Sequence, residues 1–105
     1  MIGDLSRRIT LQRPDRTADG GGGFETTWTS VGAAWASVRS SAGTEQDEGD
    51  DLVRRVGHQL RLRWRDDVVP GWRVVLEGRV LRVRSAVDRN GRKRWLDLEC
   101  EEEIR

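Results

Sequence analysis

Few side chains of this 105-residue chain have the chemistry that catalysis needs, and His58 is its single histidine. A hydrolase requires a nucleophile together with a base that can activate it. No partner for His58 emerges nearby in the sequence, and its position in the alternating pattern is shared with Leu60 and Leu62. A histidine on the apolar face of a strand is more often a hydrogen-bonded interior residue than a catalyst. The sequence therefore predicts a protein that is not an enzyme.

Cys100 and the pair Asp66-Asp67 are the remaining candidates for redox or metal chemistry. Cys100 is the only cysteine, so an intrachain disulfide is excluded and a structural zinc site lacks ligands. It alternates with Leu96 and Leu98, which indicates a small core residue. Two adjacent carboxylates without further oxygen ligands favour stabilisation of a turn over cation binding. We expect no metal and no cofactor.

Four consecutive glycines, Gly20–Gly23, could suggest a phosphate-binding loop. The run matches neither the GxGxxG fingerprint nor a P-loop, because no Lys-Ser/Thr pair follows it. Glycines without a motif carry backbone freedom and no side chain to pack. The segment 13–23 is therefore predicted to be a flexible loop.

Tryptophan and arginine are unusually prominent. The chain has five tryptophans, one phenylalanine and no tyrosine, and several tryptophans adjoin arginines, as in Arg63-Trp64-Arg65. Such pairs could stack on bases and contact phosphates in a barrel that binds single-stranded nucleic acid. They could equally anchor protein interfaces, and the net charge of +1 favours this second interpretation. Arginine is suited to interfaces, although a GC-rich genome produces the same bias.

The bulk composition predicts one domain, residues 1–105, with a thin core. Hydrophobic and charged residues each make up 35% of the chain, and the mean hydropathy is −0.71. Such a balance suits a small barrel or sheet whose outer face is solvated or covered by a partner. The amino terminus lacks the apolar stretch of a signal peptide, and no run approaches the roughly 20 residues of a membrane span. We expect an intracellular, soluble protein without a membrane partner.

Period-two alternation indicates strands along most of the chain. A first strand is expected over residues 6–12, ending before Pro14, and a long strand over 24–39. Near Gly32 the alternation changes parity, which predicts a bulge or bend; a helix over 31–38 is the competing interpretation.

The second half of the chain predicts further strands. Residues 58–77 are expected to form a hairpin with a six-residue connection that contains Pro70-Gly71. A strand over 80–87 places Leu81, Val83 and Val87 on one face, and Asn90-Gly91 favours a type I′ turn into a final strand over 94–101. Together these elements predict an all-β fold, a small antiparallel barrel of about six strands.

One segment, Ser40–Asp51, breaks this pattern because it has no large apolar residue and carries five acids. It predicts a long, flexible, exposed loop with at most one helical turn near Glu45–Glu48. Such a loop is either solvated and mobile or becomes ordered against a partner. Arg54–Arg65 follows with five arginines and no acid, so ion pairs could form within one subunit or between copies.

A series of short motifs runs through nearly the whole chain. They are Ile2-Gly3, Leu5, Arg8–Pro14, Asp19-Gly20, Gly22-Gly23, Thr27-Trp28, Trp35-Ala36, Val38, Gly43, Glu45, His58, Leu60–Arg65, Pro70-Gly71, Arg73-Val74, Gly78–Val80, Arg94–Leu96 and Leu98–Glu101. Each motif alone has little specificity, but in this order they resemble the small head–tail joining proteins of tailed bacteriophages, the head-completion or stopper group also found in gene transfer agents.

The resemblance implies a β-barrel subunit of a ring, expected to be hexameric, at the neck of a virion or gene-transfer-agent particle assembled in the bacterial cytoplasm. The ring would lie between the portal or adaptor and the tail terminator or tail tube, with double-stranded DNA passing through its lumen, and would help retain that DNA. A tail-terminator or adaptor role is the alternative within this class.

Two sets of residues are the candidates for this role. We expect an acidic loop to face the channel or the adaptor and to repel DNA phosphates; it comprises Thr44, Glu45, Asp47, Glu48, Asp50 and Asp51. We expect arginines to contribute to subunit contacts; these are Arg54, Arg55, Arg61 and Arg63.

Overall fold

The computed structural model describes residues 5–40, 44–48 and 51–104, and for 44–48 and 51–53 it describes the backbone alone. The described part is all β, as predicted, with seven strands in one antiparallel sheet. The strands are β1 (Arg7–Ala18), β2 (Phe24–Ser40), β3 (Thr44–Glu48), β4 (Asp51–Arg63), β5 (Arg73–Leu76), β6 (Arg79–Val87) and β7 (Trp95–Ile104). Within these ranges no helix is long and apolar enough to cross a membrane.

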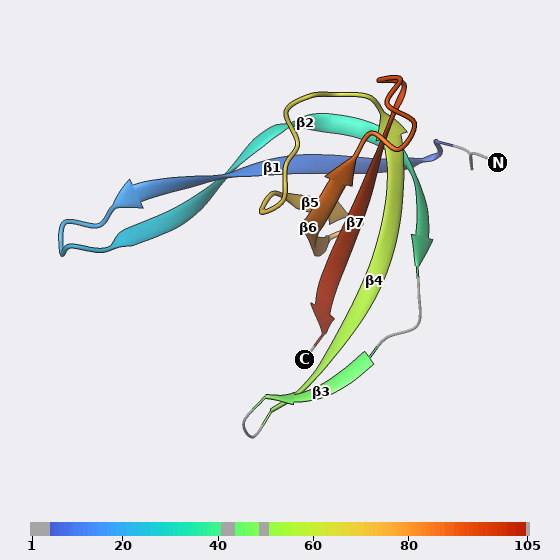
Figure 1. Ribbon diagram of the computed structural model, residues 1–105. Coiled ribbons are helices and arrows are strands. Elements are labelled where there is room, and N and C mark those ends of the chain that lie inside the picture. The colour runs from blue at the N-terminus through green and yellow to red at the C-terminus, as the bar shows by residue number, and fades with distance from the viewer. Residues whose placement is uncertain (1–4, 41–43, 49–50, 105) are drawn as a thin grey trace.

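Six of the strands close into a ring of hydrogen-bonded neighbours (Figure 1). The sheet runs in the order β2-β1-β5-β6-β7-β4-β3, and an additional pairing of β2 with β4 joins its two sides. The predicted small antiparallel barrel is therefore confirmed as a closed, barrel-like ring. β3 lies outside the ring and pairs with the first part of β4.

Alternating residues of each strand fill the interior of the ring. On β4 and β7 these are Leu60, Leu62, Leu96 and Leu98, each no more than 3% exposed. Burial of each such side chain contributes roughly 1.5–3 kcal/mol. The same face of the other strands completes the core with Ile9, Leu11, Ala36, Val74, Leu76, Leu81 and Val83.

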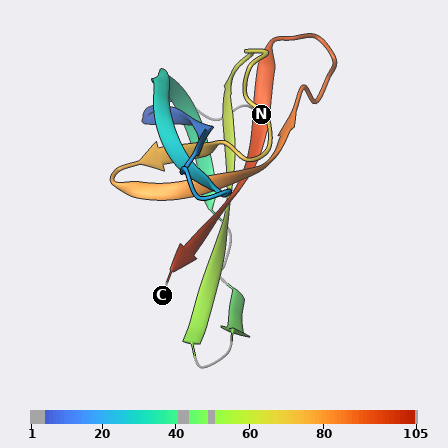
Figure 2. The same ribbon diagram turned by 90° about the vertical axis from the view of Figure 1, so that its left-hand side faces the viewer.

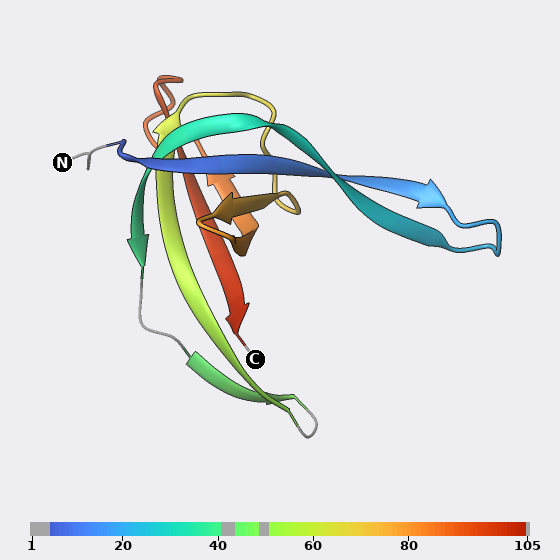
Figure 3. The same ribbon diagram turned by 180° about the vertical axis from the view of Figure 1, so that it is seen from behind.

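β1 and β2 extend far beyond the ring as a two-stranded arm, residues 13–30, which Figures 1 and 3 show from opposite sides. The predicted end of the first strand before Pro14 is wrong, because Pro14 pairs with Trp28 and β1 continues to Ala18. Proline is tolerated there because β1 pairs with β5 only as far as Gln12, so its outer edge needs no further donor. The predicted flexible loop over residues 13–23 is therefore wrong for 13–18, which belong to β1, and only residues 19–23 form the connection at the tip.

The predicted bulge in the long strand is confirmed. The register between β1 and β2 shifts at Leu11/Gln12, so that Val31 has no partner, and Gly32 has a φ of 143°. The segment is a strand, and the competing helix over 31–38 is wrong.

The predicted hairpin over residues 58–77 is also wrong, because β4 and β5 do not pair. They lie on opposite sides of the six-strand ring, β4 between β7 and β2, and β5 between β1 and β6. The connection crosses the ring because its own apolar residues, Val68 and Trp72, are buried in the core. Alternation predicted both strands but could not predict which strands pair.

The type I′ turn predicted at Asn90-Gly91 lies elsewhere in the chain. The two-residue turn with two positive φ values, the type I′ pattern, lies at Glu77-Gly78, where φ is 52° and 77°. At Asn90-Gly91 only Gly91 has a positive φ, and residues 88–94 form a longer connection between β6 and β7. Val87, predicted to face inward, is 47% exposed because a bulge between Val83 and Ser85 shifts the alternation.

The acidic segment is a strand rather than the predicted loop or helical turn. Residues Thr44–Glu48 form β3, which pairs with Asp51–Arg55 of β4 as a hairpin (Figures 1 and 2). Polar residues can form an edge strand outside a core, because such a strand needs backbone partners and no buried face. Of the predicted acidic residues, Asp50 lies outside the described part of the chain.

Candidate functional site

Ion pairs join β4 to β7 on the outer face of the ring. Arg61 and Asp97 are directly opposite in the register, and the guanidinium donates two hydrogen bonds, of 2.6 and 2.8 Å, to the carboxylate. Arg89 donates a third, of 2.8 Å. The bonds from Arg61, reinforced by Arg89, lower the pKa of Asp97 below its usual range.

A second cluster lies further along the same two strands. Arg55 approaches Glu101 at 3.1 Å and Glu103 at 3.0 Å, and Arg84 of β6 donates to Glu101 at 2.9 Å. Its bond from Arg84, together with that from Arg55, lowers the pKa of Glu101. Three strands are thereby linked through one carboxylate.

The four arginines predicted for subunit contacts therefore differ in their surroundings. Arg55 and Arg61 are held by carboxylates of their own chain, and Arg63 is exposed with its guanidinium 5.7 Å from the ring centroid of Trp95. Arg54 is exposed on the hairpin that carries β3. Their role between subunits stays a prediction.

Backbone pairing brings the acidic and basic segments together. In the β3–β4 hairpin Glu45 lies opposite Arg54, and Thr44 lies opposite Arg55. The hairpin projects away from the barrel-like ring, beside the carboxyl end of β7 (Figures 1 and 2).

A buried polar network, which sequence reasoning missed, crosses the ring at His58. Its Nδ1 lies 2.8 Å from Ser40 Oγ on β2, and its Nε2 lies 3.1 Å from Glu102 Oε1 on β7. Arg79 of β6 also donates to both oxygens of Glu102. This bond from Arg79, together with that from His58, lowers the pKa of Glu102.

A signal for this network was present in the sequence. Glu102 continues the alternating series of inward-facing residues Leu96, Leu98 and Cys100. Extending the alternation by two residues would have placed a carboxylate in the interior, where the single histidine was also expected. The prediction that His58 is a hydrogen-bonded interior residue is confirmed, since it is 3% exposed.

The order serine–histidine–carboxylate is also that of a catalytic triad. Here, however, the carboxylate that would stabilise an imidazolium already binds the guanidinium of Arg79. A hollow of about 500 Å³ lies beside Ser40 and His58. The hydrogen bonds among these four side chains join β2, β4, β6 and β7, which is a structural arrangement.

Cys100 lies in the core, as predicted. It is 4% exposed, and burial raises the pKa of its thiol to about 12. Its thiol is therefore uncharged and unreactive at neutral pH. Among the described residues, no group of three or more side chains of the metal-ligating types is placed to bind a metal ion.

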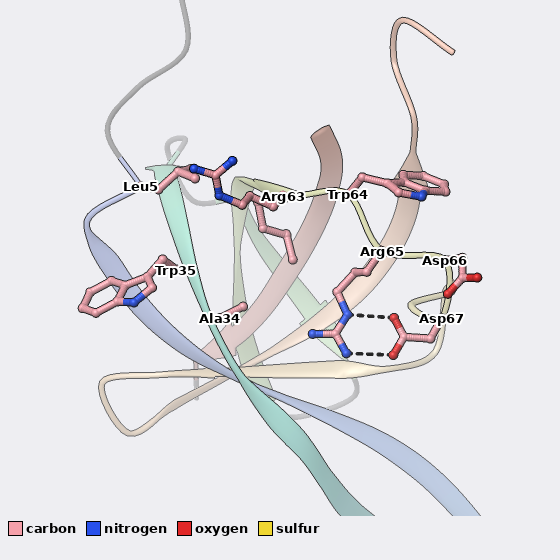
Figure 4. A pocket seen from close by; sticks show the side chains of 9 residues that line it. Leu5, Ala34, Trp35, Arg63, Trp64, Arg65, Asp66 and Asp67 are labelled. Atoms are coloured by element: carbon pink, nitrogen blue, oxygen red, sulfur yellow. Dashed lines mark hydrogen bonds and ion pairs between the residues drawn. The ribbon is translucent and has the colours of Figure 1, made fainter. Parts of the chain in front are cut away.

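Asp67 stabilises the turn after β4, as predicted for the aspartate pair. Arg65 donates two hydrogen bonds to it, of 2.7 and 2.8 Å, and these lower the pKa of Asp67. The pair borders a hollow of about 450 Å³ that is also lined by Trp35, Leu62 and Trp64 (Figure 4).

A family model described as phage head completion protein matches residues 1–103. No curated protein matches the chain.

Two solved structures have similar folds. One chain, from the virion of a native gene transfer agent particle, is 24% identical with a TM-score of 0.85, and the match covers 97% of each chain. The solution structure of a protein from Shigella flexneri 2a is 27% identical with a TM-score of 0.72, and the match covers 96% of this chain and 95% of that one.

Proposed function

Because the chain belongs to the family of phage head completion proteins, we propose that it is a head–tail connector, the stopper subunit of a ring that joins head to tail and helps retain packaged DNA. The family match over residues 1–103 is the observation that carries the proposal. The ring is homo-oligomeric, and we expect it to be hexameric. It occupies the particle neck, between the portal or adaptor and the tail terminator or tail tube.

The distribution of structure supports a role in assembly. The core of the ring is small, while the arm and the β3–β4 hairpin project from it, and the side chains of the arm are mostly exposed. Projecting two-stranded elements are marginally stable alone and gain stability when a neighbour covers them. The protein thus acts through surfaces offered to other subunits, and we infer that it has no catalytic activity.

In this proposal the acidic hairpin borders the channel or the adaptor. Residues 44–51 carry five carboxylates in eight positions, namely Glu45, Asp47, Glu48, Asp50 and Asp51. A dense negative charge repels DNA phosphates and prevents the channel wall from binding its cargo. Arg54, opposite Glu45, is exposed and is suited to contacts with a neighbouring subunit.

Replacement of these five acids by serine tests the proposal. We expect normal synthesis and folding of the chain but a loss of DNA-filled, infective or transfer-competent particles, on the order of tenfold or more, because repulsion or docking is lost. The measurement is packaged DNA per particle together with the titre.

A charge-conserving variant is the matched control. Exchange of Asp for Glu and Glu for Asp at the same five positions keeps the charge and should keep the titre. Unchanged titre and DNA content in the serine variant would count against the acidic hairpin.

A tail-terminator or adaptor ring is the second candidate, since family membership alone is compatible with each position in the neck. A monomeric barrel that binds single-stranded nucleic acid is the alternative from another class, favoured by exposed Trp35 beside Arg8. Salt-dependent binding of short single strands by the purified chain would support that alternative. We expect no such binding.

A further inference from the structure

The arm, defined as residues 13–30, lacks the support that the rest of the sheet has. Beyond Gln12 β1 pairs only with β2, and β2 meets β4 only from Ala36 onwards. An isolated two-stranded ribbon is marginally stable in water, and both of its outer edges offer unpaired backbone groups. A contact with another subunit would stabilise the ribbon and provide partners for the unpaired backbone groups at its edges.

The tip of the arm carries the most exposed large apolar side chain described. Phe24 is 63% exposed, and its ring lies 4.6 Å from the guanidinium carbon of Arg16. It has no role in the core. Aromatic side chains beside arginines are frequent anchors in protein interfaces, which makes Phe24 with Arg16 a candidate anchor.

The hollow beside Trp35 lies at the other end of the β1–β2 pair, where the two strands join the ring (Figure 4). Trp35 is 53% exposed and borders the hollow, with its indole projecting outward from β2, and Leu5, Ala34, Leu62 and Trp64 supply apolar lining. The volume of about 450 Å³ exceeds what one phenylalanine side chain needs. The hollow therefore has room for an aromatic ring next to the Trp35 position.

Charges at the two ends are complementary. Arg16 and Glu25 flank Phe24 at the tip, whereas Asp66 and Arg63 stand at the hollow, and all four are exposed. If Phe24 enters the hollow, Arg16 can face Asp66 while Glu25 faces Arg63. Complementary charge around an apolar anchor fixes orientation.

The placement of the two ends determines what such a contact builds. Ala18 pairs with Phe24 at the tip and Arg8 with Trp35 at the base, so about 36 Å of strand, at roughly 3.3 Å per residue, separates anchor from hollow. The two surfaces cannot meet within one subunit. A head-to-tail contact between different surfaces produces closed rings when its rotation closes.

We propose that the arm of one copy docks into the next copy, with Phe24 seated in the hollow beside Trp35. This inference rests on the proposed ring function and specifies its subunit contact. Each copy then provides one arm and receives one. The contact at a single tip is small, so association is weak in dilute solution and strong in the neck, where neighbouring rings hold the subunits together.

Cysteine cross-linking in assembled particles tests the contact. Arg16→Cys with Asp66→Cys in the full chain places thiols on the two sides of the junction; it replaces one of the two charge pairs and keeps Phe24, Trp35 and the pair of Glu25 with Arg63. We expect a short bismaleimide to give a ladder of multimers in particles. Buried Cys100, with its raised pKa, should not react.

Three controls make the result specific. Either single cysteine should give no ladder beyond a dimer. Phe24→Ser added to the pair should reduce the cross-linked fraction about tenfold or more, because the anchor is lost. Val80→Ser, which removes another exposed apolar side chain on β6, should leave the ladder unchanged.

The outcomes separate this inference from the function on which it rests. Particles that contain the chain but yield no ladder, or a ladder that Phe24→Ser does not reduce, would overturn the arm contact and leave the connector function standing. Particles that lack the chain altogether would overturn both.

Discussion

At the scale of single residues, the buried chemistry of this protein serves cohesion. Ser40, His58, Glu102 and Arg79 come from four different strands and satisfy one another's hydrogen-bonding groups. A buried carboxylate is costly without partners, and here both partners are supplied by neighbouring strands. The network therefore fixes how these strands are arranged around the ring.

Glu102→Gln is expected to lower the free energy of unfolding by about 1–3 kcal/mol, because charge-assisted bonds to Arg79 and His58 weaken. Urea unfolding at neutral pH measures this. Glu99→Gln, at an exposed position of the same strand, is the matched control and should change little.

The pH dependence of that difference has a definite sign. The pKa of Glu102 is lower in the folded state than its ordinary value of 4.5. The ionised carboxylate therefore contributes its full stabilisation of the fold at pH values above 4.5. That stabilisation is lost as the pH falls through the lowered pKa. The difference between the native chain and Glu102→Gln should therefore shrink in acid; a difference that grows in acid would contradict this.

Ser40→Ala tests whether the serine acts as a nucleophile. We expect neither the native chain nor the variant to hydrolyse an activated ester above the background rate, since Arg79 occupies the carboxylate partner of the histidine. Saturable hydrolysis by the native chain that disappears in the variant would show that the network is catalytic.

At the scale of elements, alternation predicted most strands and the bulge, because the period of two follows directly from which side chains must be buried. Pairing could not be predicted in the same way. Val68 and Trp72 make the connection after β4 part of the core, and that depends on contacts far apart in the sequence. β3 was missed because a polar edge strand has no apolar signal at all.

Gly32 controls the bulge from which the arm departs. Its φ of 143° is unfavourable for residues with a side chain, so Gly32→Val should cost about 1–3 kcal/mol in stability. Thermal unfolding measures the loss. Ala33→Val, an exposed change at the next position, should be tolerated; equal effects of the two would argue against backbone strain as the cause.

At the scale of the whole molecule, the protein family could be predicted from the sequence more reliably than the residues that contact other subunits. The order of motifs indicated the family, which the match over residues 1–103 shows. Arg55 and Arg61, predicted to contact other subunits, are engaged by carboxylates of their own chain, because β7 places Glu101 and Asp97 within reach. Such cross-strand partners follow from register, which local sequence does not specify.

A cryo-microscopy map of the intact particle neck tests the central claim most directly. We predict a closed ring of copies of this chain between the portal or adaptor and the tail, with the barrel-like sheet fitting as it stands and the β3–β4 hairpin next to the channel or the adaptor. A complete neck map in which no density accommodates this fold would contradict the account.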